Sequence, residues 1–339
     1  MAEHDIVVVG ASAGGVEALI QLVDELPESF PGSVFIVLHM AATSGTVLPA
    51  ILGRHTALPV AHPLDGEAVE PGRVYVAVPD RHLLFQGGRI GVTAGPKENG
   101  HRPAIDTLFR SAAASFGPRV VGVILSGTRD DGTAGLRVIH KAGGYAIVQD
   151  PDEALFPGMP LSALAGDHPD MVLPVGKIGD HLARLTGESP SATPIPDGVA
   201  AALDAELRWA QPDVTQRPEP EPPLGKASGF TCPECHGALW EIDDEHFPRY
   251  RCRVGHGFSA GTLLTTQSAG VDAALWTAYR ALEERVALCC RLAERAETRR
   301  AGLSAEYFRA EAAQVGRQAE TLRAVLWAKR PADASESGS

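Results

Sequence analysis

Five short runs of consecutive apolar, mostly β-branched residues constrain this chain more than any other feature. They lie at residues 5–10, 33–38, 73–78, 120–126 and 144–148. Apart from polar residues at their ends, such as Asp5, Ser33 and Arg73, the runs are apolar without alternation, which is typical of strands covered on both faces in a parallel sheet. Amphipathic helix candidates, such as Val16–Leu26 and Ala104–Ser115, lie between them. The sequence therefore predicts an α/β fold with a doubly wound, mostly parallel, Rossmann-like sheet.

Composition shifts divide the chain into five predicted parts. Residues 1–187 form the α/β domain, with a hairpin expected at 83–93 around Gly87-Gly88. Residues 188–229 are proline-rich and predict a linker with a short helix at 199–210. Residues 230–262 predict a zinc-ribbon-like module. Two apolar seams with helical spacing predict a helical hairpin over 263–330, followed by a disordered tail at 331–339; the seams are 275, 278, 282, 286, 289, 293 and 308, 312, 315, 319, 322, 325.

Overall charge and apolar runs exclude several classes of protein. The net charge of −12 argues against nucleic acid or an anionic membrane as the main partner. No stretch holds about eighteen apolar residues in a row, so we expect no membrane insertion. The five cysteines include the adjacent pair Cys289 and Cys290 and do not resemble a disulfide framework. We therefore expect a cytoplasmic protein.

The segment GASAGG, residues 10–15, allows three interpretations. The first is a dinucleotide-binding loop, which needs the pattern GxGxxG and an acidic residue at the end of the second strand. Here Ser12 occupies the position of the second glycine, and the second strand ends in Leu38-His39, so this interpretation is disfavoured. The segment matches G-x-S-x-G, which places a serine nucleophile on a tight strand-to-helix turn. Alternatively, Ser12 is the N-cap of the following helix.

Residues after the other strands favour the nucleophile. Ser12 follows the first strand, His39 follows the second, and Asp131 lies in the loop after the strand that ends at Ser126. The carboxyl ends of parallel strands share one edge of a sheet, so these three side chains are expected to meet there. A serine, an imidazole and a carboxylate are the groups that acyl transfer requires.

Four segments, in this order, carry a resemblance to a known family: residues 6–19, 37–40, 124–136 and the Gly158-Met-Pro segment at 158–160. They resemble the catalytic domain of CheB-type chemotaxis methylesterases over roughly residues 3–185. The resemblance implies a protein-glutamate methylesterase that demethylates glutamyl methyl esters on methylated chemoreceptors or related signalling proteins, releases methanol, and can deamidate receptor glutamines. The resemblance implies that catalysis by this enzyme needs no cofactor.

The resemblance also implies roles for individual residues. Ser12 matches the nucleophile, His39 the general base and Asp131 the triad aspartate. The amides of Ala13 and Thr128 match positions that line the oxyanion pocket. Arg102, in a block near the site, is expected either to hold substrate or to have a structural role.

Two departures from the family pattern stand out. Thr128 replaces a usual methionine, and Arg129-Asp130 replaces Gly-Asn or Gly-Ala.

Family members commonly carry an N-terminal receiver domain, and this chain begins directly at the catalytic strand. We therefore expect control to differ or to lie in the C-terminal half, with recruitment favoured over autoinhibition.

The C-terminal half contains metal-ligand spacing. Cys232-x2-Cys235 is followed after sixteen residues by Cys252-x3-His256, a zinc-ribbon pattern that predicts a closed structural Zn²⁺ site. His236 and His246 are weaker candidates for the fourth ligand, and a metal-free hairpin is the alternative. We expect metal removal to leave residues 1–187 catalytically competent. An exposed seam on the two helices would mark a homodimer or partner surface.

The residues predict a serine hydrolase, and the resemblance implies that its substrates are glutamyl methyl esters. The alternative is a non-catalytic regulatory binding module, against which the intact Ser12, His39 and Asp131 argue.

Overall fold

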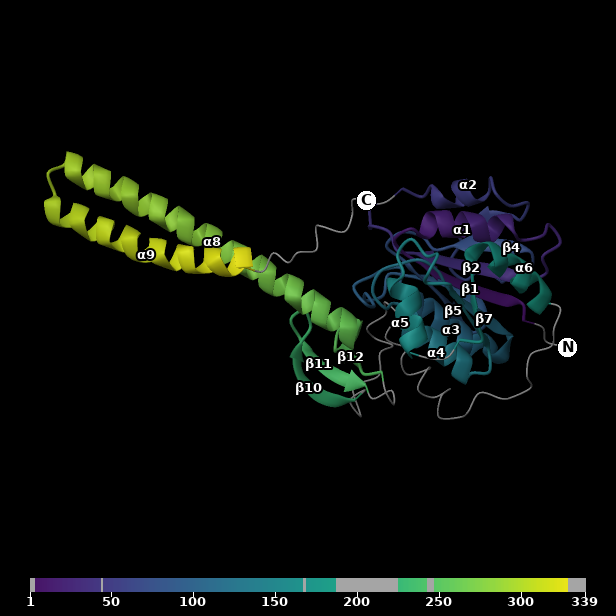
Figure 1. Cartoon of the computed structure of the whole chain (residues 1–339). Coiled ribbons are helices and arrows are strands. Elements are labelled where there is room, and N and C mark those ends of the chain that lie inside the picture. The colour runs from purple at the N-terminus through teal and green to yellow at the C-terminus, as the bar shows by residue number, and fades with distance from the viewer. Residues whose placement is uncertain (1–3, 44, 167–168, 187–224, 243–246, 329–339) are drawn as a thin grey trace. The chain divides into compact units, whose positions relative to one another are not determined.

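Seven parallel strands form the central sheet of the protein. The structure is a computed structural model that describes residues 4–43, 45–166, 169–186, 225–242 and 247–328, and by its contacts the chain divides into two units, 1–263 and 264–339 (Figure 1). The sheet order is β3-β4-β2-β1-β7-β8-β9, and every paired strand is parallel. The strands are β1 (Ile6–Ala11), β2 (Ser33–Leu38), β3 (Val60–Ala61), β4 (Arg73–Val76), β7 (Val120–Ile124), β8 (Tyr145–Gln149) and β9 (Met171–Leu173). The doubly wound fold predicted from the sequence is confirmed.

Helices cover both faces of this sheet (Figure 1). Val7 and Val9 of β1 pack into one apolar cluster, whereas Ile6 and Val8 pack into a second cluster on the opposite face. The first cluster includes residues of α1 (Gly15–Asp24), α2 (Leu48–Leu52) and α6 (Val175–Leu185); the second includes residues of α3 (Ile105–Phe116), α4 (Thr133–Lys141) and α5 (Gly158–Gly166). Because both faces of each strand are buried, the strand sequences are continuously apolar.

The order of the strands locates the candidate site. The chain runs outward from β1 through β2 and β4, then returns to place β7 on the other side of β1. Ligands of open α/β sheets bind at the carboxyl edge where the order reverses. In this protein that point lies between β1 and β7, next to the loops that follow residues 11 and 124.

The predicted hairpin is also present. Strands β5 (His82–Gln86) and β6 (Arg89–Thr93) pair antiparallel, and Gly87 and Gly88 both have positive φ, as the tight turn requires. The short 3₁₀ turn η1 (Gly117–Arg119) precedes β7. The predicted linker and its helix at 199–210 lie outside the described residues.

A small antiparallel sheet follows in the first unit, and we call residues 225–263 the ribbon. Its strands are β10 (Lys226–Thr231), β11 (Ala238–Ile242), β12 (Arg249–Cys252) and β13 (Gly257–Ser259), paired in that order. A small core contains Cys232, Leu239, Cys252, Phe258 and Leu263.

The second unit is a helical hairpin. Helix α8 (Ala260–Thr298) begins in the first unit, and α9 (Gly302–Ala328) follows it. Cys289 and Ala293 of the predicted seam are buried, as are Val315 and Ala319 of the second seam. Leu326 is buried instead of the predicted Val325, a shift of one position at the end of the helix.

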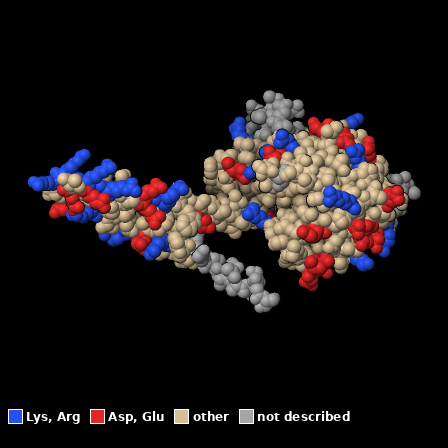
Figure 2. Space-filling model, turned by 90° about the horizontal axis from the view of Figure 1, so that it is seen from above, with Lys and Arg blue, Asp and Glu red and all other residues tan. Residues whose placement is uncertain are grey.

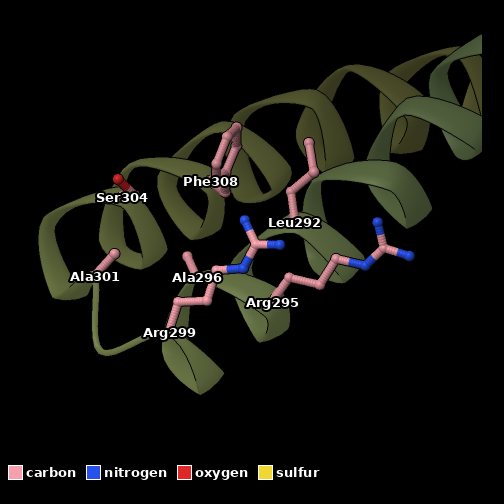
Figure 3. Close-up of a pocket in the computed structure, with 7 residues that line it drawn as sticks. All are labelled: Leu292, Arg295, Ala296, Arg299, Ala301, Ser304 and Phe308. Atoms are coloured by element: carbon pink, nitrogen blue, oxygen red, sulfur yellow. The ribbon is translucent and has the colours of Figure 1, made fainter.

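The surface of this hairpin is mixed in charge. Lys/Arg and Asp/Glu side chains alternate over the face that Figure 2 shows. A hollow near the turn is lined by residues of both helices, including Arg295 of α8, and by Arg299 just after that helix (Figure 3). Leu288 and Tyr307 are exposed, and the homodimer expected from the sequence stays a prediction. No helix in the described ranges is long and apolar enough to cross a bilayer.

Candidate active site

The structure brings Ser12, His39 and Asp131 together at the carboxyl edge of the sheet. Ser12 Oγ lies 3.2 Å from His39 Nδ1, and His39 Nε2 lies 2.7 Å from Asp131 Oδ2. The three residues follow β1, follow β2 and precede α4, respectively. The contacts form an unbroken hydrogen-bonded series from hydroxyl to imidazole to carboxylate.

A sharp turn presents Ser12 between β1 and α1. The Ser12 amide donates to the carbonyl of Ser126, which ties the turn to the end of β7. Gly14 then adopts φ of 67°, a left-handed conformation that glycine accepts without steric cost, and the helix begins at Gly15. The N-cap is Gly14, with no side-chain capping bond. The alternative that Ser12 caps the helix is therefore wrong, and its hydroxyl is available to His39.

Gly127 allows close packing behind the serine. A β-carbon at this position would lie 2.8 Å from Cβ of Ser12 and still nearer to the sulfur of Met159. Such distances are below van der Waals contact, so only glycine lets the β7 loop pass so close to the nucleophile.

The partners of His39 fix its tautomer. An ionised carboxylate only accepts hydrogen bonds, so the 2.7 Å contact with Asp131 requires the proton on Nε2. The lone pair of Nδ1 then faces the hydroxyl of Ser12. His39 is thereby oriented as a base towards the serine.

Asp131 is buried and fully hydrogen-bonded. Oδ2 accepts from His39 and from the amide of Ile105 at 2.8 Å, while Oδ1 accepts from Asn99 Nδ2 at 2.9 Å and from the amide of Asp106 at 3.2 Å. Burial alone would raise the pKa of Asp131, but the bond from His39 and the neighbouring donors outweigh it and hold its pKa below the usual range. The carboxylate is therefore charged and fixed in direction.

Asp106 is a second carboxyl in the same buried cluster. Asn99 Nδ2 lies 2.9 Å from Asp106 Oδ2 as well, so one amide group stands between the two acids. Burial and the charge of Asp131 raise the pKa of Asp106. The cluster separates the two acids in pKa, as expected for neighbouring carboxyl groups in a dry environment.

His101 is a site residue that the sequence analysis missed. Its ring stacks on His39 with centroids 3.7 Å apart. Its signal in the sequence was its position beside Arg102 in a family-like block, but nothing in that spacing indicates a stacked ring.

The oxyanion role expected for the amides of Ala13 and Thr128 stays a prediction, and the neighbouring hydrogen bonds are compatible with it. The carbonyl of Ser12 accepts from the amide of Gly15, and that of Gly127 accepts from the amide of Met159 at 2.8 Å. Because a trans peptide points its N–H away from the preceding C=O, the amides of Ala13 and Thr128 point away from these bonds. Within the described residues, neither amide donates to another protein group. Neither amide is thus committed to an acceptor within the described protein.

Arg102 makes contacts within the protein. Its guanidinium bonds to Asp80 at 2.7 and 2.9 Å and to the carbonyls of Ala94 and Gly95. These contacts account for the structural role that the sequence left open. Binding of substrate by Arg102 would require exchange of these bonds.

Three cysteines and a histidine form a cluster in the ribbon. The ligand atoms of Cys232, Cys235, Cys252 and His256 all lie within 4.8 Å of one another. His236 is not part of this cluster, and His246 lies outside the described residues. The structure therefore brings together the four residues that the sequence analysis proposed as the main ligand set.

Comparison with known proteins identifies the family of the sheet domain. A family model described as CheB methylesterase matches residues 7–182. A protein-glutamate methylesterase/protein-glutamine glutaminase of Rhizobium johnstonii is 40% identical over 51% of this chain and 48% of its own, and one of Ralstonia nicotianae is 41% identical over 53% and 49%. The crystal structure of the Thermotoga maritima CheB methylesterase catalytic domain superposes with a TM-score of 0.51 at 35% identity, covering 53% of this chain and 98% of that domain. The chain spans about half the length of the curated relatives it matches.

Proposed function

Because this chain belongs to the CheB methylesterase family, we propose that it is a serine hydrolase that demethylates glutamyl methyl esters on a signalling protein. One observation carries the proposal: the hydrogen-bonded series Ser12, His39, Asp131 at the carboxyl edge of the sheet. The expected substrate is a methylated chemoreceptor or a related signalling protein.

The geometry supports a two-step acyl transfer. His39 Nδ1 takes the proton of Ser12 as Oγ attacks the ester carbonyl, and the amides of Ala13 and Thr128 stabilise the oxyanion. Collapse of the tetrahedral intermediate breaks the bond to the methoxy group, which leaves as methanol with the proton from His39. Water then attacks the acyl-serine by the same route and releases the glutamate side chain. Asp131 stabilises the imidazolium in both steps.

Deamidation needs the same groups. With a glutamine side chain, the leaving group is ammonia, and the acyl-serine is identical. The curated relatives carry both activities in their names, which supports this second reaction at the same site.

Methanol release from methylated receptors tests the proposal. Wild-type protein should release methanol, and Ser12→Ala should reduce the rate by about 10³-fold or more, since removal of a triad member leaves only binding and oxyanion stabilisation. Ser115→Ala, near the C-terminal end of α3, is the matched control and should retain the full rate. Binding of the receptor without turnover in the wild type would favour the non-catalytic binding module instead.

A further inference from the structure

The Cys232–His256 cluster has the dimensions of a metal site. Cys235 Sγ lies 3.6 Å from Cys252 Sγ, and His256 Nδ1 lies 3.8 Å from Cys232 Sγ and 3.6 Å from Cys252 Sγ. Ligand atoms about 2.0–2.3 Å from a tetrahedral Zn²⁺ lie about 3.5–3.8 Å apart. A disulfide would need sulfurs about 2 Å apart. Three thiolates and an imidazole on two tight turns therefore suit one closed Zn²⁺ site.

The turn that carries His256 continues into the loop beside the triad. Gly257 bridges Glu98 as a parallel strand would: the amide of Asn99 donates to the Gly257 carbonyl at 2.8 Å, and the Gly257 amide donates to the Lys97 carbonyl at 3.1 Å. Gly257, which directly follows His256, is thus hydrogen-bonded to the residues on both sides of Glu98, Lys97 and Asn99.

The ribbon also sets the direction of the Asn99 amide. The backbone N–H of Ser259 donates to Asn99 Oδ1 at 2.8 Å. With Oδ1 held there, Nδ2 points to the carboxylates of Asp131 and Asp106, both 2.9 Å away. If the side-chain amide were reversed, its NH2 group would face the N–H of Ser259, and its oxygen would face the carboxyl groups of Asp131 and Asp106. The ribbon therefore dictates which end of Asn99 faces the triad.

Buried charges reinforce the contact. Glu98 lies between two arginines, 3.0 Å from Arg110 of α3 and 2.8 Å from Arg251 of β12, and all three side chains are at most 7% exposed. Removal of one partner from a buried ion pair leaves an uncompensated charge, which is strongly unfavourable. The ribbon cannot separate from this loop without that cost.

Asp130, at a position where the chain departs from the family pattern, provides a further anchor. Its carboxylate accepts from Ser259 Oγ and from Thr262 Oγ1, each at 2.6 Å. Both hydroxyls lie where β13 ends and α8 begins. The residue that neighbours the triad aspartate in sequence is therefore bonded to the ribbon.

We propose that a Zn²⁺-held ribbon is an integral part of the active site, and that Asn99 is a positioning residue through which it orients Asp131. This inference rests on the proposed function for its kinetic consequence. Loss of the metal releases Gly257 and Ser259, frees the Asn99 amide to rotate, and removes one of the three bonds that aim Asp131 at His39. The catalytic sheet domain then depends on the ribbon, contrary to the independence expected from the sequence.

The test uses the full chain, metal analysis and a fluorophosphonate probe that labels activated serines. We expect about one zinc per chain and rapid labelling of Ser12. Cys235→Ser should lose zinc and slow labelling by about tenfold or more, whereas Cys290→Ser, an exposed cysteine outside the cluster, should change neither. Asp130→Ala should keep zinc and still slow labelling. Asp152→Asn, an exposed aspartate, is its control.

The kinetics of labelling distinguish a positioning role of Asn99 from an effect on probe binding. Asn99→Ala should lower the maximal labelling rate with little change in the probe concentration for half-maximal rate, because Asn99 acts through Asp131. Hydrogen exchange at the amides of Ile105 and Asp106, which donate to Asp131, should accelerate in Cys235→Ser and in Asp130→Ala.

Two results would overturn the inference: absence of zinc from wild-type protein, or loss of zinc in Cys235→Ser with unchanged labelling and exchange. Wild-type protein that holds zinc but is never labelled would count against the proposed function. In that case the exchange measurement still decides whether the ribbon orders the residues around Asp131.

Discussion

The imidazole rings of His39 and His101 lie parallel, with centroids 3.7 Å apart and planes inclined by 4°. Burial lowers the pKa of His101 to about 4, helped by the repulsion that two protonated rings in contact would suffer. His101 is therefore neutral at pH 7, and its ring covers one face of the proposed catalytic base. A stacked neutral ring restricts the motion of His39 and keeps water from that face without a second positive charge.

Replacement of His101 tests this covering role. His101→Ala should lower kcat by about tenfold, because His39 gains water and freedom on one face, while His101→Phe should stay within about threefold of wild type, since a flat ring is restored. Steady-state kinetics of ester hydrolysis measures both. His55→Ala, an exposed histidine, is the control. Equal loss in the Ala and Phe variants would point to a direct chemical role for the His101 imidazole.

The lowered pKa of His101 predicts an acid-dependent loss of stability. In the unfolded chain this histidine takes up a proton near pH 6.5, whereas in the folded protein it does so only near pH 4. Between these values the unfolded state binds more protons, so the free energy of unfolding decreases as pH falls, by at most about 3 kcal/mol from this group. Urea unfolding at several pH values should show a smaller decrease for His101→Phe. If the free energy of unfolding depended on pH identically in wild type and His101→Phe, His101 could not be the group responsible.

Asp131→Asn tests the tautomer of His39. An asparagine can turn its amide N–H towards Nε2, which moves the ring proton to Nδ1, the atom that must accept from Ser12. The geometry should survive while kcat falls by about 10⁴-fold, as for the equivalent change in serine-protease triads. The loss should not add to that of Ser12→Ala, because the residues act as a unit. A tenfold or smaller effect would mean that Nδ1 is not the base.

Gly127→Ala tests the close packing behind the nucleophile. The added methyl group overlaps Ser12 and Met159, so we expect a loss of about 1–3 kcal/mol in the free energy of unfolding, together with lower kcat from displacement of Ser12. Gly176→Ala in α6 meets no atom within 4 Å and should be neutral or stabilising by up to about 1 kcal/mol. Thermal unfolding of the two variants checks the contrast. Equal stability of both would show that the β7 loop can move away from Ser12.

The parts of the fold that could be predicted from the sequence depend on local pattern. Buried parallel strands are apolar throughout, so β1, β2 and β7 were found within two residues of their ends. The triad followed from the rule that residues after parallel strands share an edge. Strands β3 and β9, with two and three residues, are too short to give a pattern and were missed.

The remainder of the site depends on contacts between distant segments. Asn99 and His101 lie in a loop with no periodicity, and their roles arise from Ser259 and His39, 160 and 62 positions away in the chain. The only sequence signal for the ribbon contact was the departure from the family pattern at Asp130. That departure could not be linked to the ribbon in advance, because nothing in a single sequence pairs Asp130 with the hydroxyls of Ser259 and Thr262.

The central claim, that Ser12 is the activated nucleophile, is tested most directly by mapping the site of fluorophosphonate modification by mass spectrometry. We predict a single adduct per chain, located on Ser12, absent from Ser12→Ala and strongly slowed in His39→Ala. An adduct on another residue, or undiminished modification of Ser12→Ala, would contradict the account.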